Sequence, residues 1–517
     1  MIWRLRWQVS VLGGMLVCCA AGAAAELRLP ALISDNMVLQ CGRSAPIWGW
    51  AEPGEIVTVT IAGRTAKVQA EEHGRWQVRL PALEPQDQAL EMVVGGSSGG
   101  VLRVKNVVVG EVWLCSGPSN IFWPVKRCDR AKEEIASATY PKIRFFTVGR
   151  QTADQPQTDC EGSWVECNPA SVPDVSGVGY FFARQLHEDL RTPVGLVQSF
   201  WGGSRIEAWT SMEALQANPV LRPVLDYWTR QRTTFDAVRV EADYQKALTT
   251  WQEAAAQAQA AGTKPPDKPA APADPRTSPH RPACLYNVMI APLVPYGIRG
   301  AITYQGLGNL FWAEHSRALL ETMIVDWRRR WGQGDFPVGM VQPAPYTCEG
   351  WTQSSPDAYA IQRESQLWVL QQVPHTGLAV TMDINAVDSL HFPQKQPVAR
   401  RLALWALGAV YGHAGAYQGP IYRSMSTEGD RIRIRFLHAE GGLRTSDGKP
   451  PTCFTIAGPD QVFHPATAKI EADTVVVRSD RVHQPVAVRF AWGNTEVPNL
   501  FNGAGFPASL FRTDARP

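Results

Sequence analysis

The sequence predicts an α/β protein with a doubly wound parallel sheet at its centre and a β-rich module on either side of it. Three observations support this fold class. The chain has 517 residues, more than one ordinary domain holds. Between about residues 107 and 415, short apolar strands alternate with helical segments, which is typical of a parallel sheet covered by helices. Before and after that region, apolar and polar residues alternate between turn formers, as they do in β-sandwiches.

The first 25 residues have the pattern of a secretory signal peptide. Arg4 and Arg6 provide a positive start, an apolar stretch runs from Val9 to Ala20, and three alanines at 23–25 precede Glu26. An uncleaved membrane anchor is the alternative, but the apolar stretch is well short of the roughly 20 residues that span a bilayer. We therefore expect cleavage, and an exported protein that is periplasmic or secreted.

Residues 26–106 are expected to form the amino-terminal β-sandwich module. Apolar and polar residues alternate in Ile56–Ile61, which is the period of a strand with one buried face. The turn formers Pro53 and Gly54 separate that segment from the apolar run Ile47–Trp50. Short strands with turns about every 8–12 residues are typical of a sandwich.

The region 107–415 is expected to form the doubly wound sheet, because apolar runs alternate with segments of helical period. Residues 211–283 interrupt this pattern as an insertion, with long amphipathic helices predicted for 212–261 and a Pro/Ala-rich loop for 262–282. Residues 416–517 return to alternating patterns and are expected to form a second β-rich module. The strands of the central sheet are expected at 107–114, 143–146, 194–197, 301–304, 338–341 and 378–381, and its helices at 178–190, 314–331, 359–372 and 394–411.

The composition argues against several classes of function. A net charge of +2 with 19% charged residues predicts neither nucleic acid nor an acidic membrane as a partner. Beyond the signal peptide, no stretch is apolar enough to predict an integral membrane protein. The cysteines contain no Cys-x-x-Cys pair, which disfavours zinc and thioredoxin-like sites, and we predict no metal and no cofactor. Cys160 and Cys167 flank a short loop and are expected to form a disulfide in an exported protein.

Ser119 is the candidate nucleophile. The run 107–114 predicts a buried strand, and the small residues from Cys115 to Asn120 predict a sharp turn directly after it. A serine at that place is exposed at the carboxyl edge of the sheet, where open α/β folds carry their chemistry. A plain strand-to-loop turn is the alternative for this stretch taken alone.

His391 is the candidate general base, and Asp388 is its candidate orienting partner. Both follow the strand at 378–381, and their spacing lets the aspartate accept a hydrogen bond from the second imidazole nitrogen. His391 would then take the proton of Ser119. Asp383 is a second carboxylate on the same loop, and the sequence leaves the choice between the two aspartates open.

Donors for an oxyanion hole are predicted at two further strand ends. Gly203 follows the strand at 194–197, and a glycine presents its backbone N–H without a Cβ in the way. Gln305 and Asn309 follow the strand at 301–304 and offer amide groups. Four strand ends in chain order thus carry a serine, a glycine, a pair of amides and an aspartate with a histidine, which together indicate acyl transfer.

The order and spacing of these blocks resemble the SGNH hydrolases and, within them, the exported sialate O-acetylesterase-like family. The likeness covers nearly the whole chain after the signal peptide. Segments outside the candidate site carry it as well, namely LPALISDNMVLQ, PIWGWAEPGE, GEVWLCSG, CLYNVMIAPL, RRLALWAL and PASLFRTD.

The resemblance implies an SGNH-hydrolase sheet and a serine esterase that removes O-acetyl groups from carbohydrates. It implies Ser119 as nucleophile, His391 as general base and Asp388 as the partner of the histidine. The N–H groups of Ser119 and Gly203 and the side chain of Asn309 would form the oxyanion hole. The partner would be an O-acetylated glycan, and the sequence leaves open whether this is a sialic acid or a polysaccharide such as xylan or pectin.

The chain departs from the family pattern at several positions near the site. Pro118 and Ile121 replace the usual glutamine and methionine, and Pro118 has no backbone N–H. Leu307-Gly308 replaces Glu-Ser, and Phe392 separates His391 from the following proline. We therefore expect a shifted substrate, and the alternative is a catalytically impaired member that binds carbohydrate. A lipase or protease is disfavoured because the chain has no Gly-x-Ser-x-Gly sequence.

Overall fold

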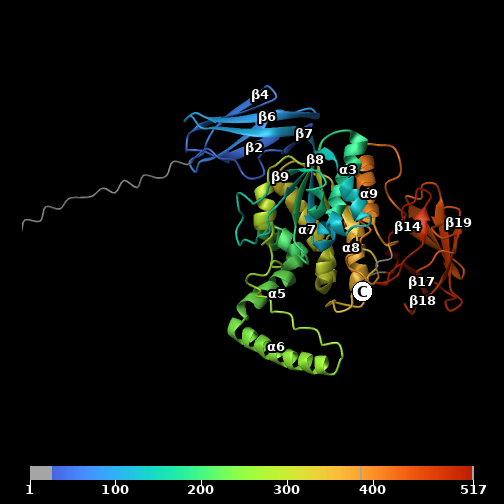
Figure 1. Ribbon diagram of the computed structural model, residues 1–517. Helices are drawn as coiled ribbons and strands as arrows, with labels where there is room; N and C mark the ends of the chain where they lie inside the picture. The colour runs from blue at the N-terminus through green and yellow to red at the C-terminus, as the bar shows by residue number, and fades with distance from the viewer. Residues whose placement is uncertain (1–25, 385–386, 515–517) are drawn as a thin grey trace, which may run out of the picture.

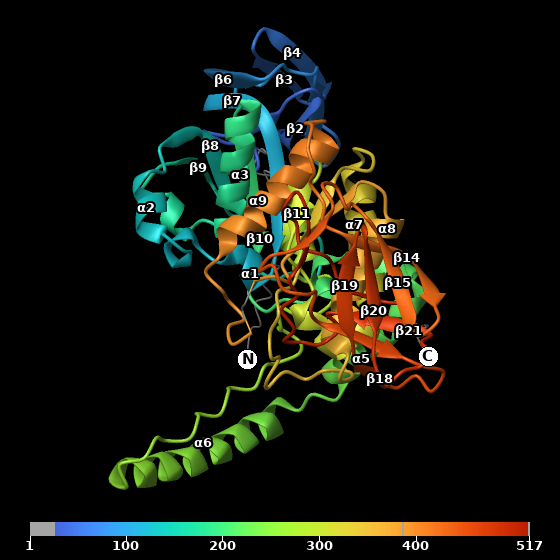
Figure 2. The ribbon, with the colours of Figure 1, turned by 90° about the vertical axis from the view of Figure 1, so that its right-hand side faces the viewer.

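A computed structural model describes residues 26–384 and 387–514, so the predicted signal peptide at 1–25 lies outside the described residues. A central α/β unit lies between an amino-terminal and a carboxyl-terminal β-rich part (Figure 1). The helix α6 (Ala237–Ala260) projects away from the central unit (Figures 1 and 2).

The central sheet is mixed. Neighbouring strands along its main path run parallel, but its edge strand β9 runs antiparallel to β8. The predicted α/β class is confirmed, and the expectation of a wholly parallel sheet is corrected at this edge. β9 pairs antiparallel with β8, the strand before it in the chain, which needs only a loop and no helical crossover. The strand order is β13 (Thr376–Val380), β12 (Val338–Gln342), β11 (Gly300–Thr303), β7 (Val101–Gly117), β10 (Val194–Phe200), β8 (Tyr140–Thr147) and β9 (Trp164–Cys167).

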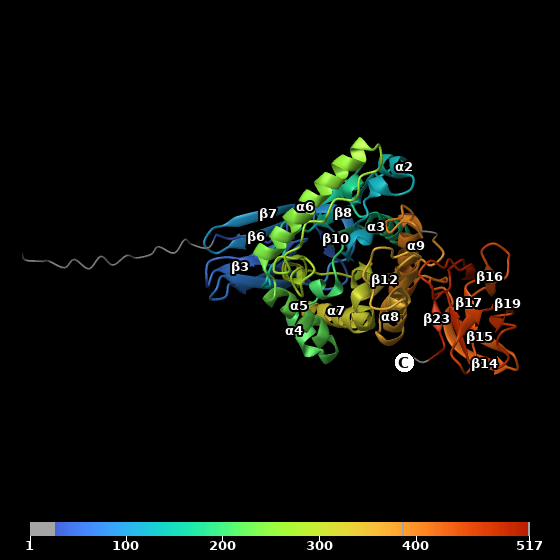
Figure 3. The ribbon, with the colours of Figure 1, turned by 90° about the horizontal axis from the view of Figure 1, so that it is seen from below.

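Helices cover both faces of this sheet (Figure 3). Successive residues of β7 enter different cores, because side chains alternate along a strand. Val112 and Leu114 belong to one core, whereas Trp113 and Cys115 belong to the other. The doubly wound arrangement predicted from the alternation of strands and helices is therefore present. The first core includes residues of α7 (Ser316–Trp331) and α8 (Ala358–Gln372), and the second includes residues of α3 (Gly177–Leu190) and α9 (Lys395–Trp405).

The strand β7 is shared between the amino-terminal part and the central sheet. Its first half pairs antiparallel with β6, and its residues from Glu111 onward pair with β10. The domain boundary expected near residue 106 thus falls within one continuous strand. The other strands of the amino-terminal part are β1 (Val38–Gln40), β2 (Ala45–Trp50), β3 (Ile56–Ile61), β4 (Arg64–Gln69), β5 (Arg75–Leu80) and β6 (Gln86–Gly96).

The carboxyl-terminal part consists of antiparallel strands only, within the described residues. One four-stranded sheet contains β14 (Ile421–Glu428), β15 (Arg431–Leu437), β20 (Thr474–Arg478) and β19 (Thr467–Glu471). A second contains β18 (Phe463–Pro465), β17 (Phe454–Ala457), β21 (Ala487–Phe490) and β23 (Phe511–Arg512), and β16 (Leu443–Thr445) pairs with β22 (Leu500–Asn502).

The insertion forms the helices α4 (Met212–Ala217), α5 (Arg222–Thr233) and α6. α5 buries Val224 and Trp228, whereas α6 buries none of its residues. The indole N–H of Trp251 on α6 donates to the Pro266 carbonyl oxygen at 2.8 Å, so the returning loop lies against this helix. Among the described residues, no helix combines the length and apolar character needed to cross a membrane.

The expected disulfide between Cys160 and Cys167 is absent, and both residues are free thiols. The physical reason is their position. Cys160 packs against the core that contains Val112, whereas Cys167 is buried in the core that contains Trp113. The two thiols therefore belong to different cores, although only a short loop separates them in the sequence. Burial raises the pKa of each thiol to about 12.

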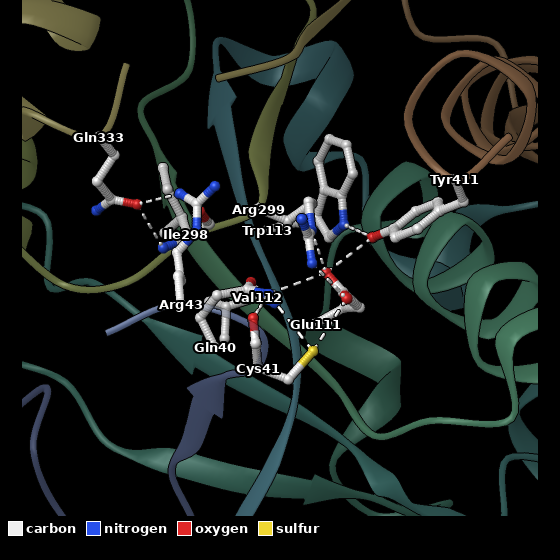
Figure 4. A network of polar contacts seen from close by, with 10 residues as sticks. All are labelled: Gln40, Cys41, Arg43, Glu111, Val112, Trp113, Ile298, Arg299, Gln333 and Tyr411. Atoms are coloured by element: carbon white, nitrogen blue, oxygen red, sulfur yellow. Dashed lines mark hydrogen bonds and ion pairs between the residues drawn. The ribbon is translucent and has the colours of Figure 1, made fainter. Parts of the chain in front are cut away.

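Glu111 ties the amino-terminal part to the central sheet through a buried hydrogen-bond network (Figure 4). Arg299 donates to both carboxylate oxygens, at 2.7 and 2.9 Å, and Gln40, Cys41 and Tyr411 donate at 3.1, 3.1 and 3.0 Å. Burial alone would raise the pKa of Glu111, but the hydrogen bonds and charge of Arg299 outweigh it and hold the pKa below its ordinary value. The carboxylate therefore joins strands and a helix end that are far apart in the chain.

Candidate active site

Ser119 lies directly after the carboxyl end of β7, on the turn predicted for the nucleophile. The strand ends at Gly117, and Ser119 begins the short helix α1 (Ser119–Phe122). Gly117 has φ +143°, and a Cβ there would lie 3.2 Å from Ile121 and 3.4 Å from backbone atoms of Tyr304. Only glycine fits this turn without strain. The turn presents a half-buried serine hydroxyl at the edge of the sheet.

His391 reaches Ser119 from the loop that follows β13. Its Nε2 lies 2.6 Å from the Ser119 Oγ, and its ring stacks on Trp123 with centroids 5.1 Å apart and planes 12° apart. Burial lowers the pKa of His391, and the positive charges of Lys395 and Arg127 lower it further. A neutral imidazole with a free lone pair at Nε2 can accept the serine proton. The structure thus brings together the predicted nucleophile and the predicted base.

Asn120 and Lys395 hold the nucleophile turn and the histidine loop together. The Asn120 Nδ2 donates to the Leu390 carbonyl oxygen at 3.0 Å, and the Lys395 Nζ donates to the Asn120 Oδ1 at 2.7 Å. Lys395 is fully buried, and burial lowers its pKa to about 7. Neither residue was predicted as part of the site. A lysine at the start of an expected helix gives no signal in the sequence that it is buried.

The two candidate aspartates lie elsewhere on the histidine loop. Asp388 is exposed, and the Asp383 carboxylate accepts from both terminal nitrogens of Arg401 at 2.7 Å. Within residues 26–384 and 387–514, no hydrogen bond or ion pair joins His391 to either aspartate. The structure therefore assembles a serine–histidine pair, and the role of Asp388 stays a prediction.

Gly203 and its neighbours border the serine. A Cβ at Gly202 would lie 3.9 Å from the Ser119 Cβ, which shows how closely this loop approaches the nucleophile. Gly203 has φ +71° and follows β10. The loop after β11 approaches the same loop closely. A Cβ at Gly308 would lie 2.8 Å from the carbonyl oxygen of Ser204, so this approach needs a glycine at position 308.

Asn309 is buried in the second of these loops. Its Oδ1 accepts from the backbone N–H of Ile206 at 3.0 Å, and its Nδ2 donates to the Glu207 Oε2 at 2.7 Å. One N–H of the Asn309 side chain remains for a further acceptor. Gln305 is also buried, and neither side-chain polar atom of Gln305 has a hydrogen-bond partner among the described residues. Glu207 is a further residue at this site that was not predicted.

A groove of about 410 Å³ opens beside Gly203. Its walls come from the loops of the central sheet and from the insertion, which contributes Tyr227 and His280. Leu307 lines this groove and also a cavity of about 10 Å³ that borders Asn120, which is about the room of one water molecule. Other residues that line the groove are Arg205, Phe311 and Trp351.

Known proteins are similar to this chain in sequence and in structure. No protein-family model matches it. The sialate O-acetylesterase of Mus musculus is 30% identical over 438 residues, covering 77% of this chain and 76% of the mouse protein. The sialate O-acetylesterase of Homo sapiens is 28% identical over 442 residues, covering 77% and 74%.

A solved structure agrees with these sequence relatives. A carbohydrate acetylesterase from Xanthomonas citri superposes with a TM-score of 0.79 at 33% identity, covering 95% of this chain and all of that one. Its similarity extends over the flanking β-rich parts as well as the central unit. The chain therefore belongs to the sialate O-acetylesterase family and is a carboxylic ester hydrolase.

Proposed function

We propose that this protein is an exported serine esterase of the SGNH type that removes O-acetyl groups from a glycan through an acetyl-enzyme intermediate. The observation that carries the proposal is the 2.6 Å contact between the His391 Nε2 and the Ser119 Oγ. The family membership supports deacetylation of carbohydrate. The signal-peptide pattern of residues 1–25 supports export to the periplasm or beyond the cell.

The mechanism follows from the serine–histidine pair. Ser119 attacks the acetyl carbonyl carbon while His391 takes its proton, and the negative charge that develops on the carbonyl oxygen needs donors. We assign these to the N–H groups of Ser119 and Gly203 and to the remaining side-chain N–H of Asn309. Collapse of the tetrahedral intermediate expels the sugar oxygen, which takes the proton from His391. Water then attacks the acetyl-serine while His391 takes its proton. The bond between the Ser119 Oγ and the acyl carbon breaks, His391 returns the proton to the Oγ, and acetate leaves.

Asp388 is proposed as the orienting partner of His391. A carboxylate at the second imidazole nitrogen fixes the tautomer in which Nε2 is free to accept, and it stabilises the imidazolium that forms. Asp383 is the less suitable candidate, because both of its oxygens already accept from Arg401. Catalytic hydrogen bonds often tighten only when substrate is bound, so the exposed Asp388 remains compatible with this role.

The glycan is proposed to bind in the groove beside Gly203. Tyr227, Phe311 and Trp351 line it, and aromatic faces pack well against the C–H faces of sugars. The small cavity that Leu307 and Asn120 line leaves no room for a long acyl chain. The alternative, a carbohydrate-binding protein without activity, is less well supported because the serine–histidine contact is intact.

Acetate release by the purified protein and by Ser119→Ala tests the proposal. Substrates would be a small acetyl ester and a panel of acetylated sialic acids, xylans and pectins. We expect the wild type to release acetate and the variant to lose activity by about 10³-fold or more. Glycan binding without acetate release from the wild type, or an active Ser119→Ala, would overturn the esterase and support the binding protein or a different nucleophile.

A further inference from the structure

We propose that Glu207 is a positioning residue that fixes the side chain of Asn309 in the oxyanion hole, and that Trp228 of the insertion holds Glu207 in place. This proposal rests on the esterase mechanism above. It adds a second layer of residues behind the oxyanion hole and gives the insertion a part in catalysis.

The contacts of Glu207 show how it acts on Asn309. The Glu207 side chain is fully buried, and each of its carboxylate oxygens accepts one hydrogen bond. Its Oε2 accepts from the Asn309 Nδ2 at 2.7 Å, and its Oε1 accepts from the Trp228 Nε1 at 3.2 Å. The carboxylate thus bridges the proposed oxyanion donor and the insertion helix α5.

The Asn309 amide has a single orientation because two groups restrain it. Its Oδ1 accepts from the Ile206 N–H at 3.0 Å, so a flipped amide would place two N–H groups against each other. Its Nδ2 donates one hydrogen to Glu207, and the planar amide then aims the second hydrogen in a fixed direction. A donor whose direction is set before the reaction needs no reorganisation in the transition state. A hydrogen bond from one N–H to an acceptor also polarises the amide and strengthens its remaining N–H as a donor.

The electrostatic surroundings of Glu207 make a purely structural role a poor explanation. Burying a carboxyl group costs folding free energy, and burial raises the pKa of Glu207 above its ordinary value, with the positive charge of Arg205 only partly offsetting this rise. Its two hydrogen-bond donors, Asn309 and Trp228, are uncharged groups that a neutral acceptor would also satisfy. A buried carboxyl group that accepts one hydrogen bond on each oxygen provides something that packing alone does not need, namely a firmly held Asn309.

The insertion contributes through α5. Trp228 is 7% exposed, and its ring lies 5.6 Å from the Arg205 guanidinium carbon. The indole thus contacts Glu207 by a hydrogen bond and, by its ring face, Arg205, which lines the groove. By contrast, α6 buries none of its residues, and none of the hydrogen bonds described for Glu207 comes from this helix.

Glu207→Gln is the first variant of the test. Glutamine keeps the size but replaces one acceptor oxygen by an N–H₂ donor, so either Asn309 or Trp228 must lose its acceptor. We expect kcat for a small acetyl ester to fall about 10–100-fold, because removal of an oxyanion donor costs about 10²–10³-fold and here the donor is displaced, not removed. KM should change by less than about 3-fold, since the substrate ground state does not use the oxyanion donor.

Trp228→Phe is the second variant, and it keeps the proposal testable if Glu207→Gln fails to fold. It removes the indole N–H and leaves a smaller aromatic ring, and we expect kcat to fall about 3–10-fold at unchanged KM. Trp251→Phe on α6 is the matched control, because it also removes an indole hydrogen bond but lies on the projecting helix. This control should retain the wild-type kcat.

A double-mutant cycle with Asn309→Ala separates positioning from general damage. If Glu207 acts through Asn309, adding Glu207→Gln to Asn309→Ala should produce no further loss of kcat. Wild-type kcat in Glu207→Gln or Trp228→Phe, or losses that multiply in the double variant, would overturn the proposal while an inactive Ser119→Ala upheld the esterase. An active Ser119→Ala would instead remove the esterase mechanism itself, so the two failures are distinguishable.

Discussion

The Nε2 of His391 lies 2.6 Å from the Oγ of Ser119, although 272 residues separate them in the chain. β7 and β13, the strands that precede the two residues, are not neighbours in the sheet, and their loops meet at its carboxyl edge. The two loops are also joined by hydrogen bonds from the Lys395 Nζ to the Asn120 Oδ1 at 2.7 Å and from the Asn120 Nδ2 to the Leu390 carbonyl oxygen at 3.0 Å. The arrangement leads to predictions for activity, stability and substrate choice.

The pH dependence of kcat/KM should report the lowered pKa of His391. The neutral imidazole is the active form, so kcat/KM should fall as the pH drops through a pKa below 6.5 and should be constant just above it. In Lys395→Met, one of the positive charges that lower this pKa is gone, and the acid limb should move to higher pH by about 0.5–1 unit. Lys246→Met on α6 is the charge-matched control, and the pH at which its kcat/KM falls should equal that of the wild type. An unmoved limb in Lys395→Met would contradict the electrostatic role of the lysine.

Substitution of Asp388 should lower activity, whereas substitution of Asp383 should lower stability. Asp388→Asn should lower kcat about 10²–10⁴-fold, because the imidazole loses the carboxylate that fixes its tautomer. Asp383→Asn should leave kcat within about 3-fold and lower the free energy of unfolding by about 1–3 kcal/mol, since it breaks the paired hydrogen bonds with Arg401. Steady-state kinetics and urea denaturation on both variants give the comparison. The reverse pattern would assign the orienting role to Asp383.

Glu111 should stabilise the fold in a pH-dependent way. Its folded-state pKa is below the ordinary value of 4.5, so its contribution is fully present above pH 4.5 and is lost as the pH falls through the lower folded pKa. Glu111→Gln should lower the free energy of unfolding at pH 7 by about 2–4 kcal/mol, because it leaves the partly buried Arg299 without its counter-ion. Denaturant unfolding at pH 7 and at pH 3.5 measures this. The difference between the two proteins should shrink at the lower pH, and a constant difference would contradict the assignment.

The groove should determine affinity for the glycan and not for a small ester. Trp351→Ala removes one aromatic wall, and we expect KM for the best acetylated glycan to rise about 3–10-fold while kinetics on a small acetyl ester stay unchanged. Trp251→Ala, outside the groove, is the control and should alter neither substrate. An equal loss of kcat/KM on the glycan and on the small ester would show that the glycan does not bind in this groove.

Local sequence patterns predicted most of the central sheet and the serine–histidine pair. Apolar runs such as 194–197 and 338–341 are buried strands in the structure, and Gly117 before Ser119 makes the sharp turn that its sequence indicates. Such features depend on neighbouring residues and are therefore readable from one sequence.

Features that depend on distant contacts could not be predicted in this way. The antiparallel strand β9 has only four residues, and its direction depends on pairing with β8. Cys160 and Cys167 are close in sequence but belong to different cores. Lys395 and Glu207 belong to residue types that are usually exposed, and only the packing around them shows that they are buried behind the site.

The most direct test of the account is the detection of the acetyl-enzyme. The protein would be mixed with an acetyl ester, quenched rapidly in acid and digested, and the peptides examined by mass spectrometry. We predict an acetyl group on the peptide that contains Ser119, at the serine itself, and none there in Ser119→Ala. Acetate release with no acetylation of Ser119, or with the acetyl group on another residue, would contradict the proposed mechanism.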